Sequence, residues 1–129
     1  MAVVLTELGE QWAAECMAQT NANDAHFIGW GTGAGTAAKA NTDLFTPATE
    51  ARVAGTVSVT GSGATAKYQV VGTLTADGAK TITNAGNWVG AGSGSPPSGG
   101  GPLVVKGDHG GIALAENDRI EYTITIDPQ

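Results

Sequence analysis

The C-terminal segment has the clearest alternation of apolar and polar residues in the chain. Residues 119–127 follow the turn-forming pair Asn117-Asp118, and Pro128 ends them because proline cannot donate to a sheet hydrogen bond. Successive side chains of a strand point to opposite faces, so this segment predicts a half-buried strand with an apolar inner face. The inner set is Ile120, Tyr122, Ile124 and Ile126, and the outer set is Arg119, Glu121, Thr123, Thr125 and Asp127.

Near the N-terminus, apolar residues recur at helical spacing instead. They are Val4, Leu5, Leu8, Trp12 and Cys16, with Glu7, Glu10, Gln11 and Glu15 on the other side. Thr6 can cap the start, and the polar run at 21–24 ends the pattern. We therefore predict an N-terminal helix or arm at residues 1–22. A single short helix is stable only when docked, either on its own sheet or on a neighbouring subunit.

Between these two segments, short apolar or β-branched runs alternate with turn residues. The predicted strands span 26–31, 50–60, 66–75, 80–83, 103–106 and 112–114. Turns are predicted at 61–63, 77–78 and 108–111, and one helical turn at 43–45. Residues 87–101 predict a long loop, flexible and rich in Gly, Ser and Pro over 90–101.

About seven short strands with turn signals roughly every 8–12 residues are typical of an all-β fold. We predict an antiparallel β-sandwich, jelly-roll or immunoglobulin-like, with one N-terminal α-helix. The arm would span residues 1–22, and the sandwich domain residues 23–129. A parallel α/β fold is excluded because no helical pattern lies between the strands.

Composition narrows the classes of partner. Charged residues make up 14% of the 129 residues, well below the usual quarter, and this suits a surface that contacts other subunits. The net charge is −6 and the six Lys and Arg are scattered, so no basic stripe for nucleic acid is visible. The sequence contains no run of 18 apolar residues, so no membrane span is predicted. Cys16 is the single cysteine, which fits synthesis in a reducing compartment and a buried structural thiol.

Motifs for cofactors and metals are weak. Glycines 29, 31, 33 and 35 alternate without opening a helix, and Gly78-Ala79-Lys80-Thr81 lacks the upstream glycine of a phosphate loop. His26 and His109 form a metal site with Asp24 and Asp108 only if distant loops converge, and a structural or solvated role is favoured. We expect no cofactor, no metal and no enzymatic activity. Trp12, Trp30 and Trp88 are candidates for stacking on a partner, with core packing as the alternative.

Several short sequence segments, taken in chain order, resemble those of a known group of proteins. They are Phe27-Ile28-Gly29-Trp30-Gly31-Thr32-Gly33, Glu50-Ala51-Arg52-Val53-Ala54-Gly55-Thr56-Val57-Ser58, Tyr68-Gln69-Val70-Val71-Gly72-Thr73, Ile82-Thr83-Asn84-Ala85-Gly86 and Ile124-Thr125-Ile126-Asp127. The chain looks like small virion structural proteins of tailed bacteriophages, and similar sandwich proteins serve as capsid decoration or cement subunits. The Gly/Ser/Pro run at 93–101 departs from the shorter connection expected of that group. The resemblance supplies no active-site residues.

The resemblance implies a capsid decoration protein that binds the assembled major capsid protein lattice and stabilises the head. Contacts are expected from the N-terminal segment and from loops 32–42 and 87–101. The candidate contact residues are Leu8, Trp12, Trp30, Trp88, Pro96 and Pro97. Neighbouring copies, as a dimer or trimer, are the second expected partner. The chain would be made in the host cytoplasm and end on the capsid exterior. The alternative is a tail or fibre component, or a host-surface glycan-binding module.

Overall fold

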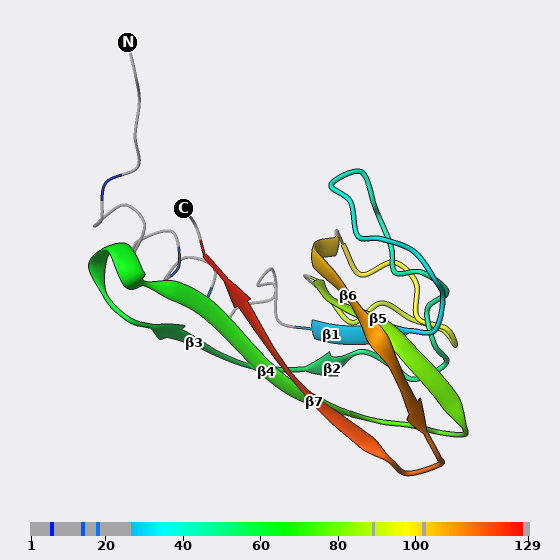
Figure 1. Ribbon diagram of the computed structural model, residues 1–129. Coiled ribbons are helices and arrows are strands. Elements are labelled where there is room, and N and C mark those ends of the chain that lie inside the picture. Colours follow the sequence, from blue (N-terminus) through cyan, green and yellow to red (C-terminus); the bar gives the residue numbers. More distant parts are fainter. Residues whose placement is uncertain are drawn as a thin grey trace.

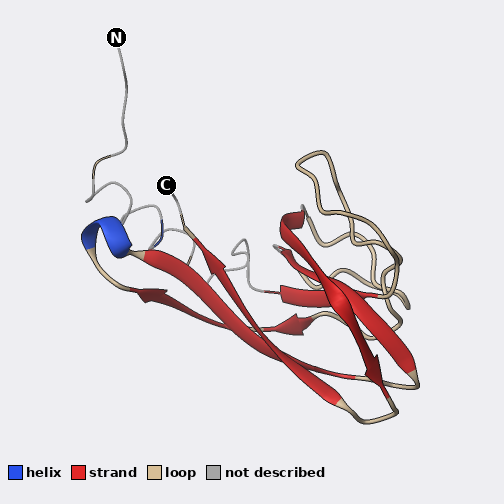
Figure 2. Cartoon of the chain, in the orientation of Figure 1, coloured by secondary structure: helices blue, strands red, loops and turns tan. Residues whose placement is uncertain are grey.

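The computed structural model describes Thr6, Ala14, Ala18 and residues 27–88, 90–101 and 103–127. This part of the chain is almost entirely β (Figure 2), as the strand patterns predict. The strands are β1 (Phe27–Gly31), β2 (Val53–Ala54), β3 (Thr56–Thr60), β4 (Lys67–Thr75), β5 (Lys80–Trp88), β6 (Leu103–Leu114) and β7 (Arg119–Ile126). A short 3-10 turn, η1 (Gly63–Thr65), lies between β3 and β4.

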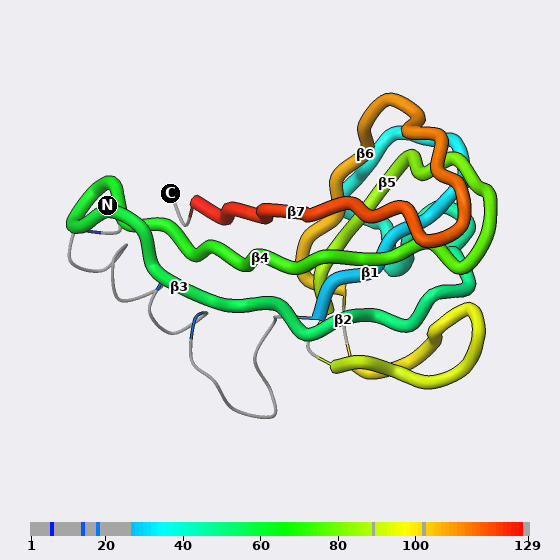
Figure 3. The backbone as a smooth tube through the Cα atoms, turned by 90° about the horizontal axis from the view of Figure 1, so that it is seen from below, coloured from blue at the N-terminus to red at the C-terminus, as the bar shows by residue number. Residues whose placement is uncertain are grey.

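The strands form two antiparallel sheets. The four-stranded sheet has the order β2-β1-β5-β6, and the three-stranded sheet has the order β3-β4-β7. Figure 1 shows the long β3-β4 hairpin and β7 reaching beyond the four-stranded sheet. In Figure 3, β3, β4 and β7 run side by side, with β7 along one border of their sheet.

The hydrophobic core draws on both sheets. Trp30, Tyr68 and Ile82 are at most 2% exposed and belong to one cluster. Full burial of such side chains contributes roughly 1.5–3 kcal/mol each, so this cluster is the main attraction between the sheets. The buried cluster comprises Ile28, Trp30, Ala48, Tyr68, Val70, Leu74, Ala76, Ile82 and Ala85.

The C-terminal strand is confirmed with the predicted alternation. All of β7 pairs with β4 without a shift, from Tyr68 opposite Ile126 to Thr75 opposite Arg119. The inner residues of β7 are half-buried and the outer ones are exposed. Its partner β4 carries the fully buried side chains of this sheet, including the predicted inward residues Tyr68, Val70 and Leu74.

The segment predicted as one strand over 50–60 divides between the two sheets. Val53 pairs with Ile28 in β1, whereas Val57 pairs with Val70 in β4. Gly55 lies between β2 and β3, at the point where the chain passes from one sheet to the other. Alternation persists through the crossing, so the sequence pattern alone did not reveal it.

Two further predictions about strands were wrong. The loop predicted to begin at Asn87 begins later, because β5 continues through Trp88. The turn predicted at 108–111 is part of one strand, β6, which spans Leu103–Leu114. Here β5 advances from Ile82 to Asn84 while β6 covers Asp108 to Ile112, so the residues around Gly110-Gly111 form a bulge instead of reversing the chain.

The helical turn predicted at 43–45 is also wrong. The Phe45 N–H donates to the side chain of Asn84 on β5, 3.0 Å away, and not to a carbonyl one helical turn earlier. Thr46 has φ +48°, outside the helical region. A tertiary hydrogen bond therefore replaces the local one.

The helix predicted at residues 1–22, with Leu8 and Trp12, lies outside the described residues apart from Thr6, Ala14 and Ala18. The Ala18 N–H donates to the Ala14 carbonyl at 3.1 Å, Ala14 is fully buried, and Ala18 packs against the core cluster. Cys16, Asp24 and His26 likewise lie outside the description. Within the described ranges, no helix is long and apolar enough to cross a membrane.

Candidate functional site

The face of the four-stranded sheet that points away from the core is covered by two loops, residues 32–52 and 90–101 (Figure 1). We call this covering the loop layer. Glycines in the strands make the close approach possible. A Cβ on Gly31 would lie 2.6 Å from the Phe45 carbonyl oxygen, and one on Gly86 would lie 3.3 Å from Leu44 Cδ2. The loops therefore rest directly on the main chain of β1 and β5.

Backbone hydrogen bonds dock the first loop on the end of β1. The N–H groups of Thr32 and Gly33 donate to the carbonyls of Thr46 and Phe45, both at 2.9 Å. The Ala48 N–H donates to the Trp30 carbonyl at 3.1 Å. The returning half of the loop thus pairs with β1 much as a short strand would.

The side chain of Asn84 forms hydrogen bonds with the backbone of Phe45 in the first loop. Its side chain is fully buried, Oδ1 accepts from the Phe45 N–H at 3.0 Å, and Nδ2 donates to the Phe45 carbonyl at 3.1 Å. An amide side chain offers both an acceptor and a donor, so it satisfies both backbone groups of one residue. Asn84 therefore fixes Phe45 against β5.

Lys106 holds the outer part of the same loop. Its ammonium lies 3.2 Å from the centroid of the Phe45 ring and donates to the Asp43 carbonyl at 2.9 Å. It also donates to Asn41 Oδ1 at 3.2 Å. Burial lowers the pKa of Lys106, and the negative charges of Asp43 and Asp108 act in the opposite direction. This one cation joins β6 to three residues of the loop.

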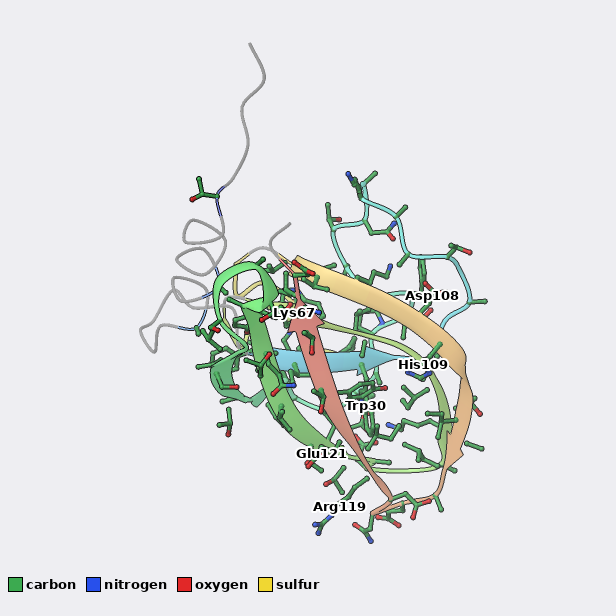
Figure 4. All side chains as sticks on the ribbon, turned by 60° about the vertical axis from the view of Figure 1, so that its left-hand side comes forward. Trp30, Lys67, Asp108, His109, Arg119 and Glu121 are labelled. Carbon is green, nitrogen blue, oxygen red and sulfur yellow. The ribbon has the colours of Figure 1, made fainter. Side chains whose placement is uncertain are left out.

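Asp108 adds a second tie between β6 and the loop. Its Oδ1 accepts from the Ala37 N–H at 2.9 Å, and Figure 4 shows Asp108 beside that loop. A groove of about 350 Å³ runs between the loop and the first half of β6. Val104 in its wall is 42% exposed. The groove is lined by Ala37, Ala38, Lys39, Asn41 and Leu103 to Lys106.

Arg52 plays the corresponding role for the loop at 90–101. The side chain is only 8% exposed and its guanidinium lies 3.8 Å from the centroid of the Trp88 ring. Nη1 donates to the carbonyls of Gly90 at 3.2 Å and Gly99 at 2.7 Å. Burial lowers the pKa of Arg52, while Asp43 acts to raise it. One guanidinium therefore joins the two ends of this loop over the indole.

The loop predicted to be flexible is also held by contacts of its own. Ser93 and Ser98 exchange two backbone hydrogen bonds of 2.9 Å. Ser95 Oγ donates to the Thr49 carbonyl at 3.0 Å, which links this loop to the first one. Pro97 is buried and Pro96 is exposed. The two loops therefore form one connected layer.

A polar cluster supports the layer from the end of β4. The Trp30 Nε1–H donates to Glu50 Oε1 at 2.8 Å, and Lys80 donates to Glu50 Oε2 and to Asp77 Oδ1. Thr49 Oγ1 donates to Asp77 Oδ2 at 2.6 Å. The Glu50 and Lys80 side chains are 8% and 13% exposed. The carboxylate of Glu50 thus joins the loop layer, the core indole and the β4-β5 turn.

The pKa values follow from this geometry. Hydrogen bonds from Lys80 and then Thr49 lower the pKa of Asp77 to about 2. Burial acts to lower the pKa of Lys80, but the hydrogen bonds with Asp77 and Glu50 outweigh burial and raise it. Both shifts favour the charged pair over a wide pH range.

A second, apolar cleft of about 200 Å³ lies between the sheets, where β6 and β7 face each other. His109 Nε2 is 2.9 Å from the Tyr122 hydroxyl, and His109 Nδ1 is 2.8 Å from the Gly110 carbonyl oxygen. A proton on Nδ1 donates to Gly110, and Nε2 then accepts from Tyr122. Burial raises the pKa of Tyr122 to about 12.

The predicted site residues that the structure describes lie both in the interior and on the surface. Trp30 and Trp88 are 2% and 3% exposed, so neither indole offers a face to a sugar ring. Of the two predicted prolines, Pro96 is on the surface and Pro97 is buried. Asp108 and His109 engage different neighbours, Ala37 and Tyr122, and no group of three potential metal ligands occurs among the described residues.

Arg52, Asn84 and Lys106 organise the loop layer and were not singled out from the sequence. Each is a polar residue within or beside an apolar or glycine-rich strand segment. For Arg52 and Lys106, two of only six basic residues in the chain, this position in the sequence was the signal that could have identified them. A cation among apolar or small residues requires polar partners when it is buried.

No protein-family model, curated protein or solved structure matches this chain.

Proposed function

We propose that this chain is a structural protein of a tailed-bacteriophage virion, and in particular a capsid decoration protein. It binds the assembled major capsid protein lattice on the outside of the head and stabilises it. Two observations support this proposal: the loop layer, and the resemblance of several sequence segments to those of such proteins. These segments surround Trp30, Val53, Tyr68, Asn84 and Ile124. In this reading the protein contributes contact surface and carries out no chemical transformation.

The loop layer is the observation that carries the proposal. Two long loops, which cost conformational entropy to order, are held in one arrangement by Arg52, Asn84 and Lys106. A surface fixed before binding loses less entropy on association than flexible loops do. The groove beside Val104 and the exposed Pro96 lie on this surface, ready for a neighbour's side chains.

A two-sheet sandwich would fit that role, and the strand order of this chain can be compared with the two predicted sandwich types. An immunoglobulin domain of the constant type combines its third, sixth and seventh strands in one sheet, whereas this chain combines β3, β4 and β7. A jelly roll uses eight strands, one more than the described residues form. We propose a sandwich because the core cluster draws on both sheets.

Stabilisation would follow from mass action. A protein that binds the assembled shell and not its free subunits adds its binding free energy to the work of disassembly. A stable contact needs roughly 800 Å² per partner, which a small domain reaches by contacting several subunits or copies. Repetition over a symmetric lattice multiplies the effect.

The glycan-binding alternative needs an exposed aromatic platform. Stacking on sugars requires an open indole face, but Trp88 lies beneath Arg52 and Trp30 is hydrogen-bonded to Glu50 inside the chain. A tail or fibre component does not require an exposed aromatic ring. The copy number per virion distinguishes it from a decoration protein, because a decoration protein is present in hundreds of copies and a tail component in few.

The test mixes purified protein with undecorated heads and measures bound protein and the melting temperature of the heads. We expect saturable binding and a higher head melting temperature. Ala40→Glu, on the exposed loop, should weaken binding, and Arg52→Met should weaken it by releasing loop 90–101. Ser58→Glu, on the exposed side of β3, is the matched control and should bind as wild type does.

Absence of wild-type binding would refute the decoration proposal. Equal loss in Ala40→Glu and Ser58→Glu would refute the assignment of the loop layer as contact surface. Thermal unfolding of each purified variant shows whether it is folded before it is mixed with heads.

A further inference from the structure

The outer edge of β7 is a regular sheet edge that could accept a further strand. It borders the three-stranded sheet and keeps register with β4 over all eight residues. In the described part of the chain, β4 is its only strand neighbour. Protein edges are usually blunted by bulges, proline or inward-pointing charges. Residues 119–126 contain no proline, have no bulge, and direct their charged side chains outward.

The edge of the other sheet provides the contrast. β6 shifts register twice against β5 and contains three glycines, and its Asp108 is bound to the loop layer. Bulges twist an edge and interrupt the row of free backbone groups, so β6 is protected against pairing. The fold blunts one long edge and leaves the other regular.

The inner face of β7 is incompletely covered. Tyr122, Ile124 and Ile126 oppose buried residues of β4, yet they are only half-buried themselves. The apolar cleft of about 200 Å³ opens beside Tyr122 and Ile124. Another strand next to β7 would extend the apolar layer and cover these side chains.

We propose that β7 pairs antiparallel with β7 of a second copy, with Thr123 opposite Thr123. A two-fold axis perpendicular to a sheet keeps each residue on its own face, so opposing residues must share parity. This register places Ile120 opposite Ile126 and Tyr122 opposite Ile124 on the inner face. The two three-stranded sheets become one six-stranded sheet.

Charge selects this register over its neighbours. It sets Arg119 opposite Asp127 of the second copy at both ends, where Asp127 also lies 3.9 Å from its own Lys67. A shift by one pair in one direction sets Glu121 opposite Asp127, which is repulsive. A shift the other way leaves Arg119 opposite Thr125. Arg119 and Glu121 lie on the exposed outer side of β7 (Figure 4), so their heads are available for such pairs.

The inference goes beyond head binding, because the dimer forms from purified protein without any other component. The first experiment measures dimerisation of the full chain by sedimentation velocity at low salt. Arg119→Asp and Asp127→Arg each set like charges opposite one another twice. Each should weaken the dimer by roughly tenfold or more. Glu116→Arg, a matched charge reversal in the turn before β7, should not.

The decisive step is to mix the two weakened variants. Arg119→Asp and Asp127→Arg together form a heterodimer in which both ends carry opposite charges again, so association should return to the wild-type level. The double variant in one chain should also dimerise. A wild-type chain that stays monomeric, or variants that do not rescue each other, would overturn the proposal.

Cross-linking tests the register directly. In a chain whose native cysteine is replaced (Cys16→Ser), Thr123→Cys should form a disulfide-linked dimer on oxidation, because the two positions meet at the axis. Thr125→Cys on the same exposed face lies opposite residue 121 and should not cross-link with itself. Equal cross-linking at both positions, or none at 123, would contradict this register even if the chain dimerises.

Discussion

The two faces of the four-stranded sheet are built from the same strands but are covered in different ways. The face toward the three-stranded sheet carries Ile28, Trp30 and Ile82, which are excluded from water by other apolar side chains. The opposite face carries glycines and Asn84, and loops cover it through hydrogen bonds and two cations. The first face is held by burial that depends little on direction, and the second by polar contacts whose geometry fixes the position of each loop.

The difference predicts unequal costs for substitutions on neighbouring residues of β5. Ile82→Ala, on the core face, should lower the free energy of unfolding by about 2–5 kcal/mol, because it removes buried methyl groups and leaves a cavity. Urea unfolding followed by tryptophan fluorescence measures this. Thr81→Ala, on the exposed neighbour, should change the same quantity by no more than about 0.5 kcal/mol. Similar values for both would show that the core does not lie where we place it.

The polar face should show a smaller and more local loss. Asn84→Asp keeps the acceptor for the Phe45 N–H but replaces the donor to the Phe45 carbonyl, which should cost about 1–3 kcal/mol. The loss should shrink at acidic pH, where a protonated carboxyl can donate again. Hydrogen exchange should speed up at Phe45 and in its loop before it does in β4.

The control for this change is the same amide-to-acid substitution at Gln69, on the outer side of β4. It should leave exchange at Phe45 unaltered. If Asn84→Asp accelerates exchange uniformly over both sheets, the side chain stabilises the core and not specifically the loop.

The smallest predicted effect is the pH dependence of the cluster that joins the two faces. The pKa of Asp77 is about 2 in the folded chain and 3.8 ordinarily, so its ionised form favours folding. This contribution is complete above roughly pH 4 and is lost as the pH falls toward 2. Asp77→Asn should flatten that part of the stability curve, measured as the urea midpoint against pH. An unchanged slope would mean that the exposed carboxylate is screened by solvent.

The same contrast explains what could be predicted from the sequence. Alternation in β4 and β7 is a property of neighbouring residues, so the strand 119–127 and the inward residues Tyr68, Val70 and Leu74 were predicted correctly. The division at Gly55 and the bulge in β6 depend on which strand lies alongside, and local pattern carries no information about that.

The loop layer was harder still to predict. Gly/Ser/Pro content correctly indicated the absence of long strands in 90–101, but the contact from Arg52 to Gly99 spans 47 residues of sequence. The pairing of Asn84 with Phe45 similarly joins residues 39 apart. Such contacts form only once the sheet has folded. Composition alone therefore predicts a flexible loop where the structure has long-range hydrogen bonds.

The glycines beneath the loop layer have a consequence for how such a protein can diverge. Where Gly31 and Gly86 meet the loops, one surface is bare main chain, whose shape is the same in every sequence. Loops can change there in length and composition without meeting side chains at these two positions, as long as the contacts from Asn84 and Lys106 are kept. The loop layer is therefore less constrained than the apolar core on the other side of the sheet, and it can change one loop at a time.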